Sequence, residues 1–323
     1  MTVPPIERAA CFPVGLIPAG PVRHLPSEAV SDDRVRQPSV DPKLSDRQAV
    51  LDRVATIAVG TSTAADRPWR SVTAPLHVFL AGLTEHREGL REGASFLQGE
   101  LIGSRRQPKA MWAMEHLAVE IGTGESGHQI NARVRAAGLL CVRYSAYGHL
   151  RDRTRIARRD YLSWAGKSEV IVADLRRYLV DVMGYPPSHV EDLEIIASTP
   201  NPDRPGRLIR VEHLPIARHC AVFPLAQPFV LHRGSNKAAI REWGERYAGF
   251  CAGLGLRCDK ASTDPARLFS FPRHPPGQPY EVEVIQGGPL DLGDCPRLKL
   301  DPPPARPRRR AAGGIEAAAE GAA

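Results

Sequence analysis

The sequence predicts an α+β fold in which helices pack on a mixed or antiparallel sheet. The chain has 323 residues, of which 42% are hydrophobic and 24% charged, so it is long and apolar enough to bury a large core. Apolar patterns typical of strands and of helices alternate along its middle. Capping residues and glycines bound the helical patterns, which is how helices in such a fold begin and end.

Seven short apolar runs predict strands, at 116–121, 139–147, 193–198, 207–213, 219–225, 267–271 and 280–285. Three amphipathic stretches predict helices. The first ends at Gly138, the second covers 168–183 with Ser168 as its N-cap, and the third covers 236–254 with Ser235 as its N-cap. Trp243 and Tyr247 lie at helical spacing in the third helix, which favours core packing over a base-stacking platform.

Composition divides the chain into four segments. Residues 1–45 are expected to be a loosely ordered leader, 46–110 an N-terminal lead-in, 111–295 the α+β core, and 296–323 a disordered Pro/Arg then Ala/Gly tail. The sequence contains no run of about 18 apolar residues, so we expect no membrane span and no membrane partner.

The net charge of +7 and the sequence pI near 9.3 favour a polyanionic partner such as nucleic acid. Arginine carries almost all of the excess, with 37 arginines against six lysines. A GC-rich genome encodes arginine in place of lysine for reasons unrelated to the function of the protein. Charge alone therefore leaves both interpretations open.

The six cysteines lie far apart and form no CxxC pair, which argues against a zinc ribbon and against a thioredoxin-type motif. We expect buried thiols in a reducing cytoplasm. They are Cys11, Cys141, Cys220, Cys251, Cys258 and Cys295.

Four stretches of the core resemble the sequence motifs of one known family and follow in the same order. They are HLAVEIGTGES (116–126), CVRYSAYGHLRDRTRIARRDYL (141–162), RVEHLPIARHCAVFPLAQPF (210–229) and LGLRCDKASTDPARLFSFPRHPPGQPYEVE (254–283). The most specific piece is DPARLFSFPRHPPG. Together they resemble the archaeo-eukaryotic primase (prim-pol) superfamily, in the primase-like module of plasmid and phage replication proteins. The resemblance covers about residues 83–292 and implies a primase/RRM-like catalytic core.

The resemblance implies a nucleotidyl-transfer site that uses Mg²⁺ or Mn²⁺ held by carboxylates. Its implied metal ligands are Glu120, Asp259 and Asp264, and His149 joins them as a catalytic residue. The first acidic motif is degenerate, because Gly122 stands where the family has its second carboxylate. Glu125, in the following turn, is the nearest alternative ligand. Nucleotidyl transfer is therefore expected to be weakened or lost.

The resemblance also implies residues that bind nucleotide or nucleic-acid phosphates. They are Arg143, Arg151, Arg153, Arg155, His213, Arg218, Arg267 and Arg273, with Arg158 and Arg159 beside them. Structural alternatives stay open for several of these side chains. The arginines at 151–159 fit an ion-paired surface loop with Asp152 and Asp160, His213 fits a structural strand histidine, and Arg267 fits a turn held by Asp264.

The sequence contains no GxxxxGK[ST] phosphate loop, so a helicase motor is expected either to be supplied by a separate chain or to have been lost. It also contains no nucleophile elbow, HExxH motif or Rossmann fingerprint. Three functions remain. The first is a mobile-element DNA primase or polymerase that binds DNA and nucleotides, the second a non-catalytic protein that binds single-stranded DNA or an origin, and the third a basic scaffold unrelated to replication.

Overall fold

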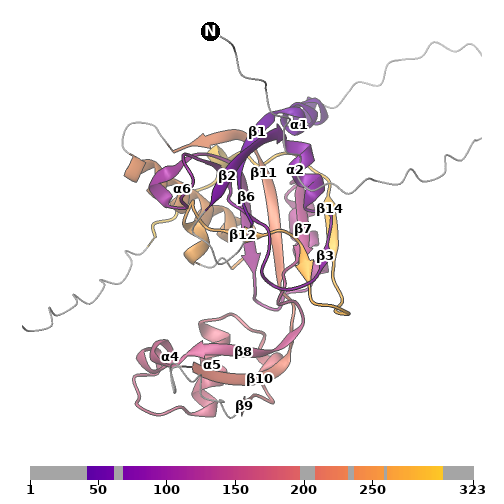
Figure 1. Ribbon diagram of the computed structural model, residues 1–323. Helices are drawn as coiled ribbons and strands as arrows, with labels where there is room; N and C mark the ends of the chain where they lie inside the picture. Colours follow the sequence, from indigo (N-terminus) through magenta and orange to yellow (C-terminus); the bar gives the residue numbers. More distant parts are fainter. Residues whose placement is uncertain (1–41, 62–67, 197–207, 232–235, 258–259, 301–323) are drawn as a thin grey trace, which may run out of the picture.

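The computed structural model describes residues 42–61, 68–196, 208–231, 236–257 and 260–300, and it has the predicted α+β fold with antiparallel sheets and packed helices. The chain forms a main body and a smaller lobe that is inserted between two neighbouring strands of the main sheet (Figure 1). The predicted leader up to residue 41 and the tail from residue 301 lie outside the described residues.

The main body is built around a five-stranded antiparallel sheet of order β14-β7-β11-β6-β5. Its strands are β5 (Gly99–Leu101), β6 (Met111–Ile121), β7 (Cys141–Ser145), β11 (His219–Val230) and β14 (Val282–Ile285). β6 and β11 lie inside the sheet, and β6 along almost its whole length and β11 over residues 219–225 are buried, because further layers cover both faces there. This explains why their sequences read as continuous apolar runs rather than as alternating ones.

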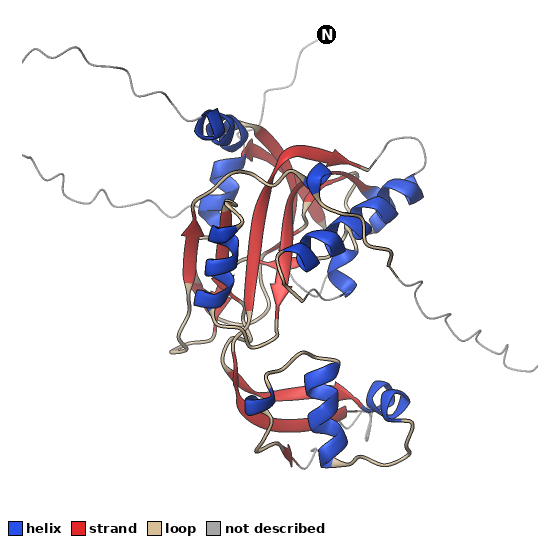
Figure 2. Ribbon diagram, turned by 180° about the vertical axis from the view of Figure 1, so that it is seen from behind, coloured by secondary structure: helices blue, strands red, loops and turns tan. Residues whose placement is uncertain are grey.

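One face of the central sheet is covered by α3 (Gly127–Ala136) and α6 (Asn236–Gly253) (Figure 2). Ser126 begins α3 with a capping box, in which its hydroxyl accepts from the Gln129 backbone and the Gln129 side chain accepts from the Ser126 backbone. Trp243 and Tyr247 of α6 are fully buried in the core, as the helical spacing predicts.

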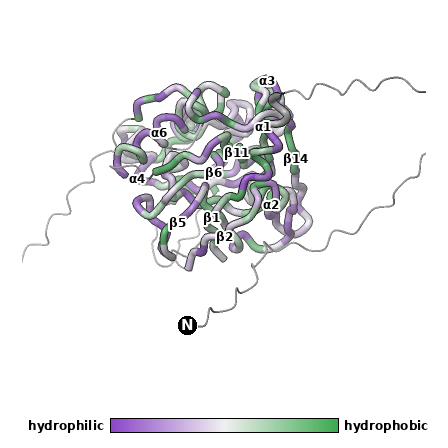
Figure 3. The backbone as a smooth tube through the Cα atoms, turned by 90° about the horizontal axis from the view of Figure 1, so that it is seen from above, coloured by the Kyte–Doolittle hydropathy of each residue, from purple (hydrophilic) through white to green (hydrophobic). Residues whose placement is uncertain are grey.

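The opposite face packs against a second sheet of order β12-β4-β1-β2 and against helix α2. Seen from above, β6 and β11 lie between α6 and α2 (Figure 3). A short parallel pair of strands, β3 and β13, lies beside these layers. The elements are α1 (Pro42–Asp52), β1 (Val54–Gly60), β2 (Trp69–Pro75), α2 (Leu76–Gly82), β3 (Arg87–Glu88), β4 (Ser95–Phe96), β12 (Phe269–Ser270) and β13 (Arg273–His274).

The inserted lobe has its own three-stranded antiparallel sheet, of order β8-β10-β9, and its own apolar core. Its elements are β8 (Arg151–Ala157), α4 (Arg158–Ala165), α5 (Val172–Asp181), β9 (Glu194–Ile196) and β10 (Leu208–Ile216). Both helices pack on one face of this sheet, and no described element covers the other face (Figures 1 and 2).

Two local expectations need correction. Residues 151–157 form the strand β8 rather than a surface loop, because Thr154 and Ile156 point into the core of the lobe while Arg151, Arg153 and Arg155 at the alternate positions point outward. The second helix begins at Val172 rather than after Ser168. The N-cap is Ile171, whose backbone N–H donates to the buried Tyr161 hydroxyl, so the helix begins three residues later than expected.

The free cysteines Cys141, Cys220 and Cys251 are buried, as expected, whereas Cys295 is partly exposed. Cys11 and Cys258 lie outside the described residues. Within the described ranges, no helix has the length and apolar character needed to cross a membrane.

Candidate functional site

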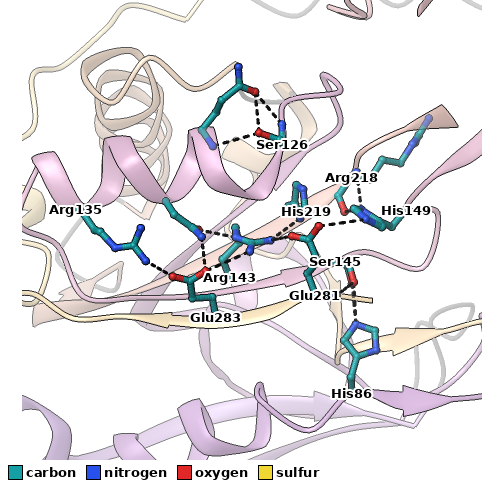
Figure 4. Close-up of polar contacts among 12 residues, drawn as sticks. His86, Ser126, Arg135, Arg143, Ser145, His149, Arg218, His219, Glu281 and Glu283 are labelled. Atoms are coloured by element: carbon teal, nitrogen blue, oxygen red, sulfur yellow. Dashed lines mark hydrogen bonds and ion pairs between the residues drawn. The ribbon is translucent and has the colours of Figure 1, made fainter. Parts of the chain in front are cut away.

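Several predicted site residues gather where the main sheet meets the inserted lobe, a region that we call the neck. Ser145 at the end of β7 lies directly opposite His219 at the start of β11, and both strands continue into the lobe from this point. The neck therefore brings His149 and Arg218, from the two connections, close to Arg143 on β7 (Figure 4).

Arg143 is buried, with 3% of its side chain exposed, and its guanidinium N–H groups have acceptors on neighbouring elements. Nε donates to Asn131 Oδ1 at 2.6 Å, and Nη1 lies 2.9 Å from both Glu281 Oε2 and His219 Nδ1. Nη2 lies 3.7 Å from Glu283 Oε2. A buried cation needs such partners. Arg143 therefore ties α3, β7, β11 and β14 together.

His219 is neutral because a guanidinium faces its Nδ1, which must accept. Burial and the charge of Arg143 lower the pKa of His219 to about 3. The proton of the neutral ring therefore lies on Nε2. His219 therefore accepts a hydrogen bond from Arg143 in the neck and has a structural role there.

His149 packs against His219 with ring centroids 4.9 Å apart, and its Nδ1 lies 3.2 Å from the Arg218 backbone nitrogen and 3.1 Å from the Arg218 carbonyl oxygen. Its Nε2 lies 3.9 Å from Glu281 Oε1. Burial lowers the pKa of His149 and the nearby Arg143 charge adds to this effect, whereas the Arg218 carbonyl and Glu281 oppose it.

Glu120 lies on the other face of the central sheet. It is directly opposite Cys220, which is itself opposite Tyr144, so these three side chains share one face. Arg143 and His219 occupy the alternate positions and point to the opposite face. The structure therefore does not bring Glu120 and His149 to the same side of the sheet.

Arg267 is the partner of Glu120. Its Nη2 donates to Glu120 Oε2 at 2.8 Å, and 42% of the Glu120 side chain is exposed. Asp264 positions this arginine through a tight turn, in which Asp264 Oδ1 accepts from the Ala266 backbone and the Asp264 carbonyl accepts from the Arg267 backbone, both at 2.8 Å. A guanidinium thus supplies positive charge at the carboxylate expected to hold a metal.

Gly122 follows β6 at the position of the missing carboxylate. A Cβ atom added there would meet no atom within 4 Å, and the φ angle of Gly122 is not positive, so the backbone does not require glycine. Glu125, the alternative ligand, instead pairs with Arg133 of α3. Space for a second carboxylate is therefore present, and the nearest acidic side chain is engaged elsewhere.

The acidic residues that the structure describes do not fit a two-ion site. Glu120 pairs with Arg267, and Asp264 holds a turn, while Asp259 lies outside the described residues. Within the described ranges, no group of three or more His, Cys, Asp or Glu side chains is arranged to hold a metal ion.

The remaining predicted residues divide between the lobe and the main body. Arg151, Arg153 and Arg155 are exposed on β8. His213 is buried in the lobe, where its Nε2 lies 2.8 Å from Thr154 Oγ1 and burial lowers its pKa. Arg273 lies apart from the neck and donates to the carbonyls of residues 90 and 92, which holds a loop of the main body.

Sequence reasoning missed several residues of the neck, namely Asn131, Tyr185, His219, Glu281 and Glu283. His219 adjoins the predicted Arg218, so it was within reach of the motif. The two glutamates alternate in YEVEVI, which indicates that they share a face, but the sequence alone does not pair that strand with β7.

No family model matches the chain, and no curated protein matches it. A solved structure with some likeness is the AEP domain of the cyanophage S-2L primase-polymerase. It has 13% sequence identity and a TM-score of 0.30, and the match covers 76% of this chain and 90% of that chain. A likeness at this TM-score does not assign a fold family or a function.

Proposed function

We propose that this protein is a replication-associated, primase-polymerase-like protein of a mobile element in which nucleotidyl transfer is weakened or lost. The class of protein is supported by the order of the four motif regions in the sequence. The loss is supported by one observation, the Arg267–Glu120 ion pair at 2.8 Å. It lies beside Gly122, which has no side chain to supply the second carboxylate.

The ion pair matters because it satisfies the carboxylate without a metal. A guanidinium carries one fixed charge and donates directional hydrogen bonds, so it neutralises Glu120 in place. Mg²⁺ binding at Glu120 would have to break this pair and would add charge beside a guanidinium. Any remaining transfer activity would need Mg²⁺ or Mn²⁺ at a site with one carboxylate fewer than the family pattern.

The same observation favours a second candidate function, a non-catalytic protein that binds single-stranded DNA or an origin. Phosphate binding by arginines requires no metal. In either case the proposal allows a helicase as a partner. The basic scaffold unrelated to replication is the outcome that an absence of DNA binding would favour.

The proposal can be tested by primer extension with Mg²⁺ or Mn²⁺. The samples are the natural chain, Gly122→Asp, and Gly122→Asp combined with Arg267→Gln, which restores one carboxylate and frees Glu120. Gly253→Asp is the matched control, because a Cβ added at Gly253 also meets no atom within 4 Å. We expect little extension by the natural chain and by the control, and a gain of at least ten-fold in the double variant that a further Glu120→Ala change removes.

Two outcomes would overturn the proposal. One is that neither the natural chain nor any variant binds or extends primed DNA. The other is that the natural chain extends primers efficiently and still does so after Glu120→Ala, because the chemistry would then lie outside this site.

A further inference from the structure

The uncovered face of the inserted lobe carries arginines at alternate positions of one strand. Arg151, Arg153 and Arg155 of β8 are exposed on this face, while Thr154 and Ile156, at the alternate positions, face the core of the lobe. Arg210 of β10 lies directly opposite Arg155 and extends the row to the neighbouring strand. We call these four residues the arginine face.

Composition does not explain this grouping. In the described part of the lobe, residues 151–196 and 208–216, nine basic side chains are balanced by nine acidic ones. The arginines concentrate along β8, which is one edge of the sheet and carries three of them beside one acidic residue, Asp152. Acidic side chains of the same face lie on the other two strands, where Glu212 is opposite Arg153 and Glu194 is opposite Glu212. The basic part of this face is therefore its β8 edge.

The arginine face has few internal partners. Arg153 is 66% exposed and pairs with Glu212 at 3.2 Å, in an exposed pair of the kind that contributes little to stability. Arg151 stacks on Tyr147, with its guanidinium 5.0 Å from the ring centroid. Arg151, Arg153 and Arg155 are exposed, whereas Arg210 is only partly exposed. The three arginines of β8 are therefore available to solvent and to a ligand.

The row continues into the neck. A Cβ atom added to Gly148 would lie 3.4 Å from Arg218 and 3.8 Å from Arg151, so both arginines lie close to this glycine. Arg218 is itself held there because its Nη2 donates to the Tyr185 hydroxyl at 2.7 Å. Arg151, at the start of β8, therefore lies near Arg218 of the neck.

We propose that the arginine face binds the phosphate backbone of a single-stranded nucleic acid that runs along β8 toward the neck. Alternate residues of a strand are about 6.7 Å apart, which suits successive phosphates of an extended single strand. Among the residues that the structure describes, no helix or strand ribbon projects from this uncovered face to enter a duplex groove. This inference rests on the proposed function for the class of partner, and it requires no nucleotidyl transfer.

The experiment is a salt titration of binding, with the full chain and a fluorescein-labelled oligo(dT) followed by anisotropy. The test variant is Arg153→Gln with Arg155→Gln. The matched control is Arg176→Gln with Arg177→Gln, which removes the same charge from exposed positions of α5 on the other side of the same lobe. Thermal melting by circular dichroism checks that both variants keep the fold.

We expect the arginine-face variant to bind about ten-fold more weakly at low salt, with a slope of log affinity against log salt that is smaller by about 1.4, since each single-strand phosphate contact contributes about 0.7. The control should bind within about two-fold of the natural chain. Equal losses in both variants, or no loss in the first, would overturn the inference. Equal loss with an oligo(dT) and with a duplex of the same length would overturn its single-strand part.

This test is independent of the extension assay. If every variant fails to extend primers but the arginine face still determines the oligo(dT) affinity, the inference stands. The proposed primase-polymerase-like function then loses its support to the non-catalytic DNA-binding protein. If Gly122→Asp with Arg267→Gln gains activity but the arginine-face variant binds normally, the inference falls and the proposed function stands.

Discussion

Arg143 and Arg153 lie ten residues apart in one motif region, yet the main body and the inserted lobe give them opposite environments. Arg143 is 3% exposed and is surrounded by Asn131, His219 and two glutamates. Arg153 is 66% exposed and pairs with one glutamate. Burial, rather than residue type, separates an arginine that holds the fold together from one that can bind a ligand.

The two environments also differ in how they respond to solvent. A buried cation is weakly screened by salt, and removing it leaves its partners without compensation. An exposed cation is strongly screened, and its loss changes stability little. Stability measurements should therefore respond mainly to changes in the main body, and binding measurements mainly to changes in the inserted lobe. The expected effects are given from the largest to the smallest.

The largest effect is expected for Arg143→Met. This change should lower the free energy of unfolding by about 3 kcal/mol, the lower end for a broken buried ion pair, because Glu281 and Glu283 are partly exposed. Arg153→Met should change it by less than about 0.5 kcal/mol. Urea denaturation followed by circular dichroism measures both. Similar losses in the two variants would contradict the comparison.

A pH effect should follow from His219, whose folded pKa of about 3 lies below the ordinary value of 6.5. The folded state keeps this ring neutral, so its contribution is fully present above pH 6.5 and is lost as the pH falls toward 3. The expected slope is about 1.4 kcal/mol per pH unit below 6.5. Urea denaturation between pH 6.5 and 5 should show a shallower slope for His219→Asn than for the natural chain. Identical slopes would show that His219 is not held neutral.

A smaller effect is expected for Tyr185→Phe, which links the lobe to the neck. Its hydroxyl lies 2.8 Å from Thr154 Oγ1 and accepts from Arg218 at 2.7 Å. Loss of both contacts should lower the free energy of unfolding by about 1.5 kcal/mol and should weaken oligo(dT) binding, because Arg218 loses its support. Tyr280→Phe, at a ring that is 52% exposed, is the control and should leave both measurements unchanged.

The smallest effect on stability is expected for Gly122→Asp, because a Cβ atom there meets nothing within 4 Å. The free energy of unfolding should stay within about 0.5 kcal/mol of the natural value. Gly99→Ala provides the contrast, since its Cβ would lie 1.9 Å from the Ala113 carbonyl oxygen and should destabilise the main body strongly. A large loss in Gly122→Asp would show that the space beside β6 is not open.

Periodicity and capping predict β6, β7, β10, β11, β14 and the helices α3, α5 and α6 well, apart from the start of α5, because apolar runs and caps are local signals. The strand β8 escapes such reasoning because Thr154 and Ile156 are its only two buried side chains, and the arginines at 151, 153 and 155 are typical of a loop. Its identity as a strand depends on pairing with β10, which is distant in the sequence.

The candidate site is predicted less completely than the fold. The spacing of motifs cannot predict the pairing of Arg267 with Glu120, because the two residues are 147 positions apart. The separation of Glu120 from His149 depends on the register between β6, β11 and β7, where a shift of one residue would reverse the faces. Local patterns do not determine register between strands that are joined by long connections.

The direct pairing of Ser145 with His219 makes the lobe separable in principle. Opposed residues of an antiparallel pair are about 5 Å apart at their Cα atoms, which a two-residue hairpin turn can bridge. A chain that passes from β7 to β11 through such a turn would keep the register of the central sheet while omitting some seventy residues. The protein can thus be regarded as a β-hairpin whose turn has been replaced by a small domain, an arrangement in which the domain can be exchanged without redesigning the sheet that carries it.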